Sequence, residues 1–315
     1  MIISNARSLL NMASIQKDMT QGYCSLEQLA KHIEFTYNHI PDIFDELTVD
    51  KVLDIQNRIR NGRYTLLSLQ LLVVSSKENI KSLNFAHIMH LLINNEIYYG
   101  IVTPIQEDKL VLMALGRMLN HAILDLNLLN ENSFGLKTIL PDYYSHIISI
   151  DRPILRLYKL DMTNSLRVIN KESLLTKLEP IVKNDEIMKL LKSYLYMPII
   201  LEGKDITYLM KDDSIPSSGL ITDVLLNFSL INLDNKFQEL FPEFLYTRYI
   251  HEVLIKIPTT ASKQVQNFEE QIVEVFDDLN LAGKIMSIGP GDEPLPCHHG
   301  GIISISREGI LQLKI

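Results

Sequence analysis

Hydrophobic positions recur at helical spacing in the first part of the chain. Between residues 25 and 60, apolar side chains return every three or four positions, which is typical of amphipathic helices. Ser25 followed by Gln28 predicts a capping box at the start of the first of these helices. A second helix is predicted to start at Thr48 and to end at Gly62, because glycine commonly ends helices.

Short apolar runs, which are typical of strands, follow these helices. Residues 64–76 and 98–103 predict two strands, and residues 84–95 between them predict a helix. Residues 155–160 predict a further strand, and residues 301–315 predict a hairpin. The chain therefore alternates between helical and extended patterns.

The most distinctive stretch covers residues 214–234. Pro216 fixes φ and lacks an amide hydrogen, and Gly219 lets the backbone bend, so the two predict a tight turn. After this turn the apolar residues follow helical spacing, with Asn227 on the same face as Leu220. An ordinary buried helix preceded by a turn explains this pattern when the stretch is taken alone.

Composition places the chain among ordinary globular proteins. Its 315 residues are 46% hydrophobic and 22% charged, enough for one large domain or two lobes. We find no apolar run long enough to span a bilayer and no secretory signal. The two cysteines, Cys24 and Cys297, predict no disulfide framework and favour a reducing compartment.

Net charge limits how the chain can bind nucleic acid. The formal charge is −8 at pH 7, whereas a protein that binds RNA mainly through phosphates is expected to be basic. Any RNA contact is therefore predicted to be local, or the partner is another protein. The absence of tryptophan, with abundant Ile, Asn, Lys and Tyr, is typical of an AT-rich genome and indicates an organelle-encoded gene.

One small basic group is a candidate RNA contact. Arg58, Arg60 and Arg63 lie beside Tyr64 at the end of a predicted helix, where they could contact phosphates. The alternative is a solvated helix end, whose cations interact favourably with the helix dipole.

Two groups of potential metal ligands are weaker candidates. His87 and His90 are one helical turn apart, but no Cys, Asp or Glu accompanies them at a useful spacing, which favours a packing role. Cys297, His298 and His299 supply three potential zinc ligands. A fourth ligand is missing, and adjacent ligands close poorly around one ion, so no metal site is predicted.

Several segments resemble motifs of group II intron reverse transcriptases. The family motif P-Q-G-G-x-x-S-P-x-L-x-N-x-x-L-x-x-L-D matches in register at Pro216, Gly219, Leu225, Asn227, Leu230, Leu233 and Asp234. Further resemblances follow the family's order along the chain, at residues 104–111, 132–137, 155–166 and 248–255. The resemblance runs from about residue 45 to the end of the sequence.

This resemblance implies an α+β fold made of fingers and palm, as in right-hand polymerases. The antiparallel palm sheet is expected to be covered by helices on one face. The implied division is a helical extension over 1–47, a fingers-like region over 48–150 and a palm-like region over 151–315. The helical thumb and the endonuclease module of the family are expected to be absent.

The resemblance also locates a degraded catalytic site. The first metal-binding aspartate of the family corresponds to Asp161, whereas the hairpin motif R-Y-A-D-D reads R-Y-I-H-E, with His251 and Glu252 in place of two aspartates. In the family, these carboxylates hold two Mg²⁺ ions. Imidazole is a poor ligand for Mg²⁺, and glutamate moves the carboxylate outward. We therefore expect these three positions to be vestigial.

Other losses point the same way. The family's Lys and Arg that hold the triphosphate have no convincing counterpart, although Lys77 and Lys81 lie nearby. Ser217 and Ser218 replace Gln and Gly, and Leu166 replaces the aromatic residue under the nucleotide sugar. We expect no cofactor, and Mg²⁺ only if residual polymerase activity exists.

The leading hypothesis is a structural component of an organellar ribonucleoprotein, most specifically the mitochondrial ribosome. Its expected partners are organellar RNA, proteins of a large assembly, or both, with no small-molecule substrate. The expected location is the mitochondrion, with the plastid as the alternative. Other hypotheses are a maturase that folds intron RNA, a subunit of a protein-only mitochondrial complex, and an active polymerase using Asp161 and Glu252.

Overall fold

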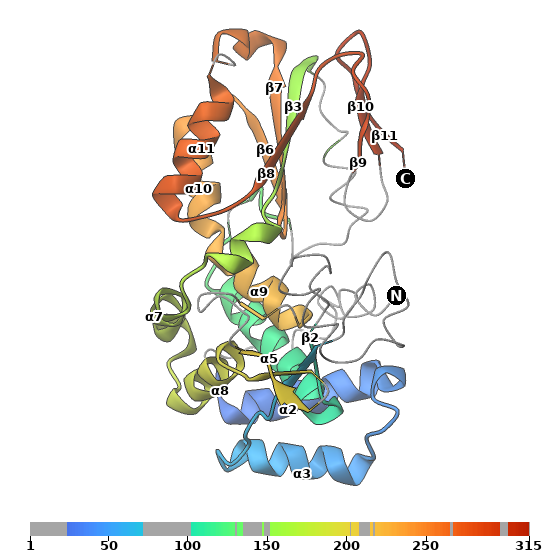
Figure 1. Cartoon of the computed structure of the whole chain (residues 1–315), viewed down its shortest axis with the longest axis vertical. Helices are drawn as coiled ribbons and strands as arrows, with labels where there is room; N and C mark the ends of the chain where they lie inside the picture. The colour runs from blue at the N-terminus through green and yellow to red at the C-terminus, as the bar shows by residue number, and fades with distance from the viewer. Residues whose placement is uncertain are drawn as a thin grey trace. The chain divides into compact units, whose positions relative to one another are not determined.

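A computed structural model gives the structure of most of the chain (Figure 1). The residues it describes are 24–71, 102–129, 131–134, 147, 152–201, 203–207, 215–216, 218–264, 267–296 and 302–314. Several predictions fall outside the described residues, namely those on 1–23, Lys77, Lys81, the helix at 84–95 with His87 and His90, 135–137, Ser217, Cys297, His298 and His299.

The described chain forms two compact units that are not consecutive in sequence. The first is built mainly from Ser14–Ala122 and Asn170–Thr222, and the second mainly from Ile123–Ile169 and Asp223–Ile315. The chain therefore passes from the first unit to the second, returns, and passes again. The boundaries predicted after residues 47 and 150 follow the family's regions rather than these units, and they stay a prediction.

Helical capping in the first unit agrees with the sequence. Helix α2 spans Leu26–His39 and begins with the predicted capping box, in which the Gln28 amide donates to Ser25 Oγ at 3.1 Å and the Ser25 amide donates to Gln28 Oε1 at 3.0 Å. Helix α3 spans Val49–Arg60 and is capped by the side chain of Thr48. Gly62 follows with φ of 64°, which glycine adopts at little cost.

Among its described residues, the first unit also contains three further α-helices and a small sheet. The helices are α5 (Gln106–Asp125), α7 (Lys171–Val182) and α8 (Asp185–Leu195). The sheet has the order β2-β1-β4-β5, with β2 at Val102–Pro104, β1 at Leu69–Leu71, β4 at Ile199–Leu201 and β5 at Lys204–Asp205. The core of this unit lies where α2, α3 and α5 bury their apolar side chains.

The strand predicted over residues 64–76 is shorter in the described part of the chain. Asp108, near the start of α5, accepts hydrogen bonds from the Tyr64 hydroxyl at 2.8 Å and from the Leu67 amide at 2.9 Å. These bonds hold the backbone before residue 69 against a side chain instead of a neighbouring strand. Pairing therefore starts only at Leu69, which lies opposite Pro104.

The stretch at 214–234 forms two helices instead of the single predicted helix. Helix α9 covers Leu220–Ser229 and helix α10 covers Ile231–Leu240. Leu230 separates them with φ of −88° and ψ of 1°, outside helical geometry. The predicted turn precedes α9, and Thr222 Oγ1 fixes it by accepting from the Ser218 amide at 2.9 Å.

The second unit contains the predicted antiparallel palm sheet. Its strands lie in the order β6-β7-β3-β8 and cover Leu245–Tyr249, Glu252–Pro258, Ile154–Asp161 and Lys284–Ile288. Helices α10 and α11 (Phe268–Leu279) cover one face of the sheet (Figure 1). Tyr158 of β3 packs edge-on against Phe268 of α11, with 5.0 Å between ring centroids.

A second, smaller sheet completes this unit. Its strands are β9 (Leu295–Pro296), β10 (Ile302–Ile305) and β11 (Leu311–Lys314), in the order β11-β10-β9. The β10–β11 pair confirms the hairpin predicted near the end of the sequence. Short 3₁₀ segments occur at Pro41–Ile43, Thr163–Arg167 and Thr259–Gln264. Within the described residues, no helix combines the length and the apolarity needed to cross a membrane.

The capping box provides a direct test of the first unit. We expect Ser25→Ala to reduce the free energy of unfolding by about 1 kcal/mol, because it removes a side-chain acceptor from the first turn of α2. Urea unfolding followed by circular dichroism measures the change. Ser173→Ala is the matched control, since Ser173 is exposed in the first turn of α7 and makes its capping contact through its backbone amide. Equal effects at both serines would contradict the assignment.

Candidate functional site

The hairpin between β6 and β7 carries the residues that sequence analysis singled out. Tyr249 pairs with Glu252 across the hairpin, so Ile250 and His251 form its turn. Ile250 has φ of 55°, an unfavourable left-handed conformation for a β-branched residue. The buried guanidinium of Arg248 holds this turn, because Nη1 donates to the Ile250 carbonyl at 2.8 Å.

Strand register brings the three predicted positions together at one end of the palm sheet. Asp161 of β3 is directly opposite Glu252 of β7, so both side chains lie on the same face of the sheet. The Met162 amide donates to the His251 carbonyl at 2.8 Å and fixes the turn beside the end of β3. Strand register thus makes the three positions neighbours, and their role as vestigial metal-binding positions stays a prediction.

Asp161 is held as a carboxylate by local hydrogen bonds. Its Oδ1 accepts from the Thr163 amide at 3.0 Å and from the Thr163 hydroxyl at 2.6 Å. Partial burial opposes ionisation, but these hydrogen bonds, with the nearby His251 and Lys159, lower the pKa of Asp161 below its ordinary value. One oxygen of this carboxylate, Oδ1, therefore already accepts two hydrogen bonds from within the chain.

Glu252 is neutralised by a lysine on the neighbouring strand. Lys159 Nζ lies 2.7 Å from Glu252 Oε2, and only 10% and 3% of the two side chains are exposed. Lys159 also donates to the Pro296 carbonyl of β9. Sequence analysis missed this residue, although it lies two positions before Asp161, a spacing that places both side chains on one face of a strand.

These residues do not fit a pair of Mg²⁺ ions. Magnesium requires several hard oxygen ligands in near-octahedral geometry, and two such ions need a strongly negative site. Here an ammonium group faces Glu252, and an imidazole stands at position 251. Among the described residues, no three His, Cys, Asp or Glu side chains converge on a point that could hold a metal ion.

A second lysine is buried on the same face of the sheet. Lys256 is opposite Leu157 in the β3–β7 register, two pairs along from the pair formed by Asp161 and Glu252 on that face. Its side chain is fully buried, and within the described structure its Nζ has no hydrogen-bond partner. Burial lowers the pKa of Lys256 to about 7.

The opposite face of the sheet contains a buried polar network centred on Arg248. The guanidinium donates to Asp234 through Nε at 2.6 Å and Nη2 at 2.5 Å, to Asn227 Oδ1 at 2.6 Å and to Ser133 Oγ at 2.7 Å. The Tyr246 hydroxyl donates to Asp234 Oδ1 at 2.5 Å. Although burial disfavours its charge, Asp234 raises the pKa of Arg248, so the guanidinium stays protonated.

This network is built from residues that match three of the motifs singled out in the sequence. Asn227 and Asp234 belong to one motif, Ser133 to another and Arg248 to the hairpin motif. The 132–134 segment also pairs with the strand, since the Phe134 amide donates to the Arg248 carbonyl at 2.8 Å. Residues that match the motifs thus stabilise the unit, whereas His251 and Glu252, which differ from the motif, lie outside this network.

The predicted RNA-contacting arginines lie in the first unit. Arg58 forms an ion pair with Glu107 at 2.7 Å, and Arg60 forms one with Glu27 at 2.9 Å. Arg63 is exposed. Two of the three charges are thus partly neutralised by neighbouring carboxylates, and RNA contact at this position stays a prediction.

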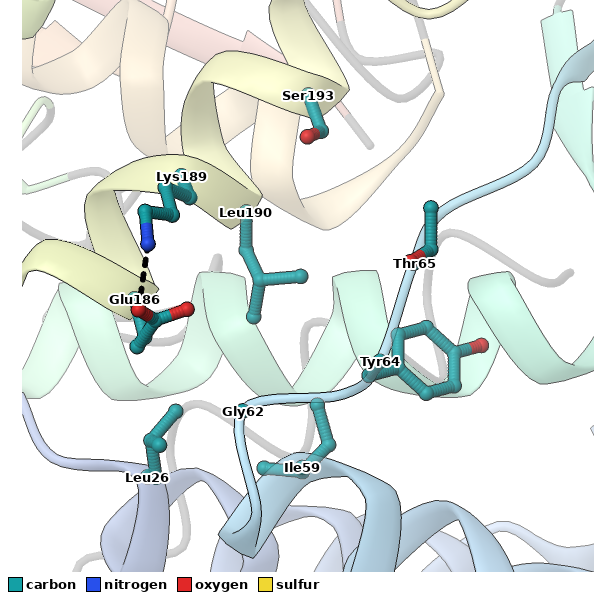
Figure 2. Close-up of a pocket in the computed structure, with 9 residues that line it drawn as sticks. All are labelled: Leu26, Ile59, Gly62, Tyr64, Thr65, Glu186, Lys189, Leu190 and Ser193. Atoms are coloured by element: carbon teal, nitrogen blue, oxygen red, sulfur yellow. Dashed lines mark hydrogen bonds and ion pairs between the residues drawn. The ribbon is translucent and has the colours of Figure 1, made fainter.

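A cavity of about 300 Å³ lies in the first unit between α8 and the start of α2 and end of α3 (Figure 2). Leu26, Ile59 and Leu190 line its apolar part. The charged groups at its margin, Lys189 and Glu186, pair with each other at 2.6 Å. We assign no reaction to this cavity, since its two charged groups neutralise each other.

We compared the sequence and the structure with those of known proteins. No protein-family model matches the sequence, and no curated protein matches it. The chain is similar to a telomerase from Candida tropicalis in complex with a TWJ fragment of telomeric RNA, with a TM-score of 0.51 and 10% identity over 85% of this chain and 56% of that chain. A telomerase from Candida albicans in complex with the same kind of RNA fragment matches with a TM-score of 0.50 and 12% identity over 79% and 47%.

The chain has a polymerase-like fingers and palm fold of the reverse-transcriptase type. This confirms the α+β class and the antiparallel palm sheet covered by helices on one face. At 10% and 12% identity the likeness extends to the fold alone. The chain spans about half the length of these two telomerase chains.

We expect Arg248→Met to lower the free energy of unfolding by about 3–5 kcal/mol, because it leaves the Asp234 carboxylate buried without its counter-ion. Chemical unfolding measures the loss. The double variant Arg248→Met/Asp234→Leu is expected to recover part of it, since no lone charge then remains. Arg152→Met, an exposed arginine in the same unit, is the control and should change stability by less than about 0.5 kcal/mol. A small effect of Arg248→Met would contradict the network's structural role.

Lys256→Met is expected to stabilise the protein, most strongly at and below pH 7. The folded state lowers the pKa of Lys256 to about 7, so between pH 7 and 10.5 the unfolded chain binds more protons and stability rises with pH. The variant's free energy of unfolding should exceed that of the unaltered chain by on the order of 1–3 kcal/mol below pH 7, and this difference should shrink towards pH 10.5. Urea unfolding from pH 6 to 10 measures it, with exposed Lys314→Met as the control. A pH-independent difference would contradict this account.

Proposed function

We propose that this chain is a catalytically inactive reverse-transcriptase-like protein that serves as a structural component of an organellar ribonucleoprotein, most specifically the mitochondrial ribosome. The observation that carries the proposal is the buried ion pair between Lys159 and Glu252, 2.7 Å apart. It occupies the position where a polymerase of this fold requires carboxylates that are open to metal.

Electrostatics make this arrangement unsuitable for phosphoryl transfer. Two-metal catalysis uses divalent cations to stabilise both the attacking and the leaving oxygen. A divalent ion approaching Glu252 would have to displace a lysine ammonium that is itself almost completely buried. The displaced ammonium would then be desolvated without a partner, which is unfavourable in a protein interior.

The intact scaffold beneath this site supports a structural role. The network around Arg248 is fully buried and links β6 to α9, α10 and the 132–134 segment. A chain that had lost both its reaction and any need for its fold would be expected to lose such a network, because one unpaired partner is costly. Retention of the framework beside the altered site favours a binding or assembly function.

RNA and protein contacts are both compatible with this proposal. The two telomerase structures described above are complexes with fragments of telomeric RNA, which supports an RNA partner for this fold. The net charge of −8 disfavours extensive binding to RNA phosphates, so RNA contact is expected to be local, with Arg58, Arg60 and Arg63 as the candidates. The remaining contacts would be to proteins of the same particle. Descent from a group II intron reverse transcriptase and expression in mitochondria rest on the motif resemblance and the AT-rich composition.

A group II intron maturase is the second candidate function. The ordered motif resemblance to that family favours it. Such a protein folds intron RNA through a basic surface, whereas this chain is acidic overall. A subunit of a protein-only mitochondrial complex suits the acidic charge better but gives the fold no RNA-related role.

We expect the purified chain to show no template-dependent primer extension with Mg²⁺ or Mn²⁺, because Lys159 neutralises Glu252 and His251 replaces a carboxylate. Extension assays with RNA and DNA templates measure this, with an active reverse transcriptase as the positive control. Asp161→Ala is the matched variant, and it should behave as the unaltered chain does. Extension that is clear in the unaltered chain and absent in this variant would overturn the proposal.

Assembly is tested separately by sedimentation of the tagged protein after native purification from its source organelle. We expect co-migration with ribosomal RNA in a large particle that RNase disrupts. A particle that resists RNase would favour a protein-only complex. Slow sedimentation as a monomer would contradict the structural role and would favour the maturase hypothesis.

A further inference from the structure

A buried basic cluster lies between α2 and α5 in the first unit, apart from every site described above. Arg117 of α5 is 2% exposed, and its guanidinium carbon lies 3.4 Å from the ring centroid of Phe35 in α2. His32 of α2 is 4% exposed, and its ring is 5.2 Å from that of His121 in α5. These residues bring cationic and imidazole groups into the core of an acidic protein.

The positive charge of Arg117 is not balanced by the residues that the structure describes. Its Nε and Nη1 are buried and donate to no acceptor within those residues, and no described carboxylate pairs with it. The Phe35 ring offers a cation–π contact but no hydrogen-bond acceptor. Burying a guanidinium in this way is costly unless an anion accompanies it.

His32 does not balance the positive charge of Arg117. Burial, with the neighbouring His121 and Arg117, lowers the pKa of His32 to about 3, so the ring is neutral at physiological pH. Its buried Nδ1 also has no hydrogen-bond partner among the described residues. The cluster therefore presents a fixed cation and a ring nitrogen that can donate in one tautomer.

We propose that Arg117 and His32 form a binding site for a phosphate group. A phosphate offers several acceptor oxygens in different directions, which suits donors from two side chains, and its charge balances that of Arg117. His121, whose ring lies beside that of His32, is only partly buried. This site is independent of the palm sheet, and it goes beyond the proposed structural function.

Thermal unfolding of the full chain in rising inorganic phosphate, at constant ionic strength in a non-phosphate buffer, tests the site. A ligand that binds only the folded state raises the unfolding midpoint. We expect a saturable rise of roughly 2–4 °C for the unaltered chain. Arg117→Met should abolish the response and should raise the midpoint in the absence of phosphate, because it removes an uncompensated buried charge. Arg152→Met, at an exposed arginine, should leave the response unchanged.

Equal responses in the unaltered chain and Arg117→Met, or no saturable response, would overturn the proposal. Equilibrium dialysis with radiolabelled phosphate keeps the test decisive if the variant does not fold. It should find one site per unaltered chain, and finding none would overturn the proposal. Adenosine monophosphate in place of phosphate distinguishes the source: half-saturation at a lower concentration assigns the site to a nucleotide, and equal or weaker binding assigns it to free phosphate.

Discussion

The buried pair of Arg248 and Asp234 is the interaction on which the second unit depends. Both side chains are essentially inaccessible to solvent, and their closest atoms lie 2.5 Å apart. The same guanidinium bonds to Asn227, Ser133 and the Ile250 carbonyl, so one side chain joins α9, α10, a loop and the hairpin turn. It also holds Ile250 in an otherwise unfavourable backbone conformation. Position and shape of the hairpin thus follow from charge pairing in the core instead of from metal binding at its tip.

The two faces of the palm sheet differ in the charges that they bury. The face towards α10 and α11 keeps its polar network and its aromatic packing, for example Tyr158 against Phe268. The other face carries Lys159 and Lys256, two buried amines on adjacent strands. One of them neutralises Glu252, and the other has its pKa lowered by burial. A sheet face with this charge pattern disfavours divalent cations, whereas the opposite face continues to stabilise the fold.

Much of the fold could be predicted from the sequence, because its signals are local. The capping box at Ser25 and the strand ending at Asp161 follow from residue types and spacing, whereas the hairpin around His251 is implied by the motif resemblance. The break at Leu230 and the shortened strand before Leu69 could not, since they depend on backbone geometry and on a distant acceptor, Asp108. The pairing of Lys159 with Glu252 depends on strand register across nearly a hundred residues of sequence. Its only local signal is the two-residue spacing from Asp161.

Binding of Mn²⁺ at the palm site tests the central claim most directly. Electron paramagnetic resonance distinguishes free from protein-bound Mn²⁺, and Asp161→Ala isolates the contribution of this site. The account predicts identical Mn²⁺ binding by the unaltered chain and the variant, because the Lys159 ammonium already neutralises Glu252. Bound Mn²⁺ that disappears with Asp161→Ala would contradict it and would show that the site still holds a catalytic type of cation.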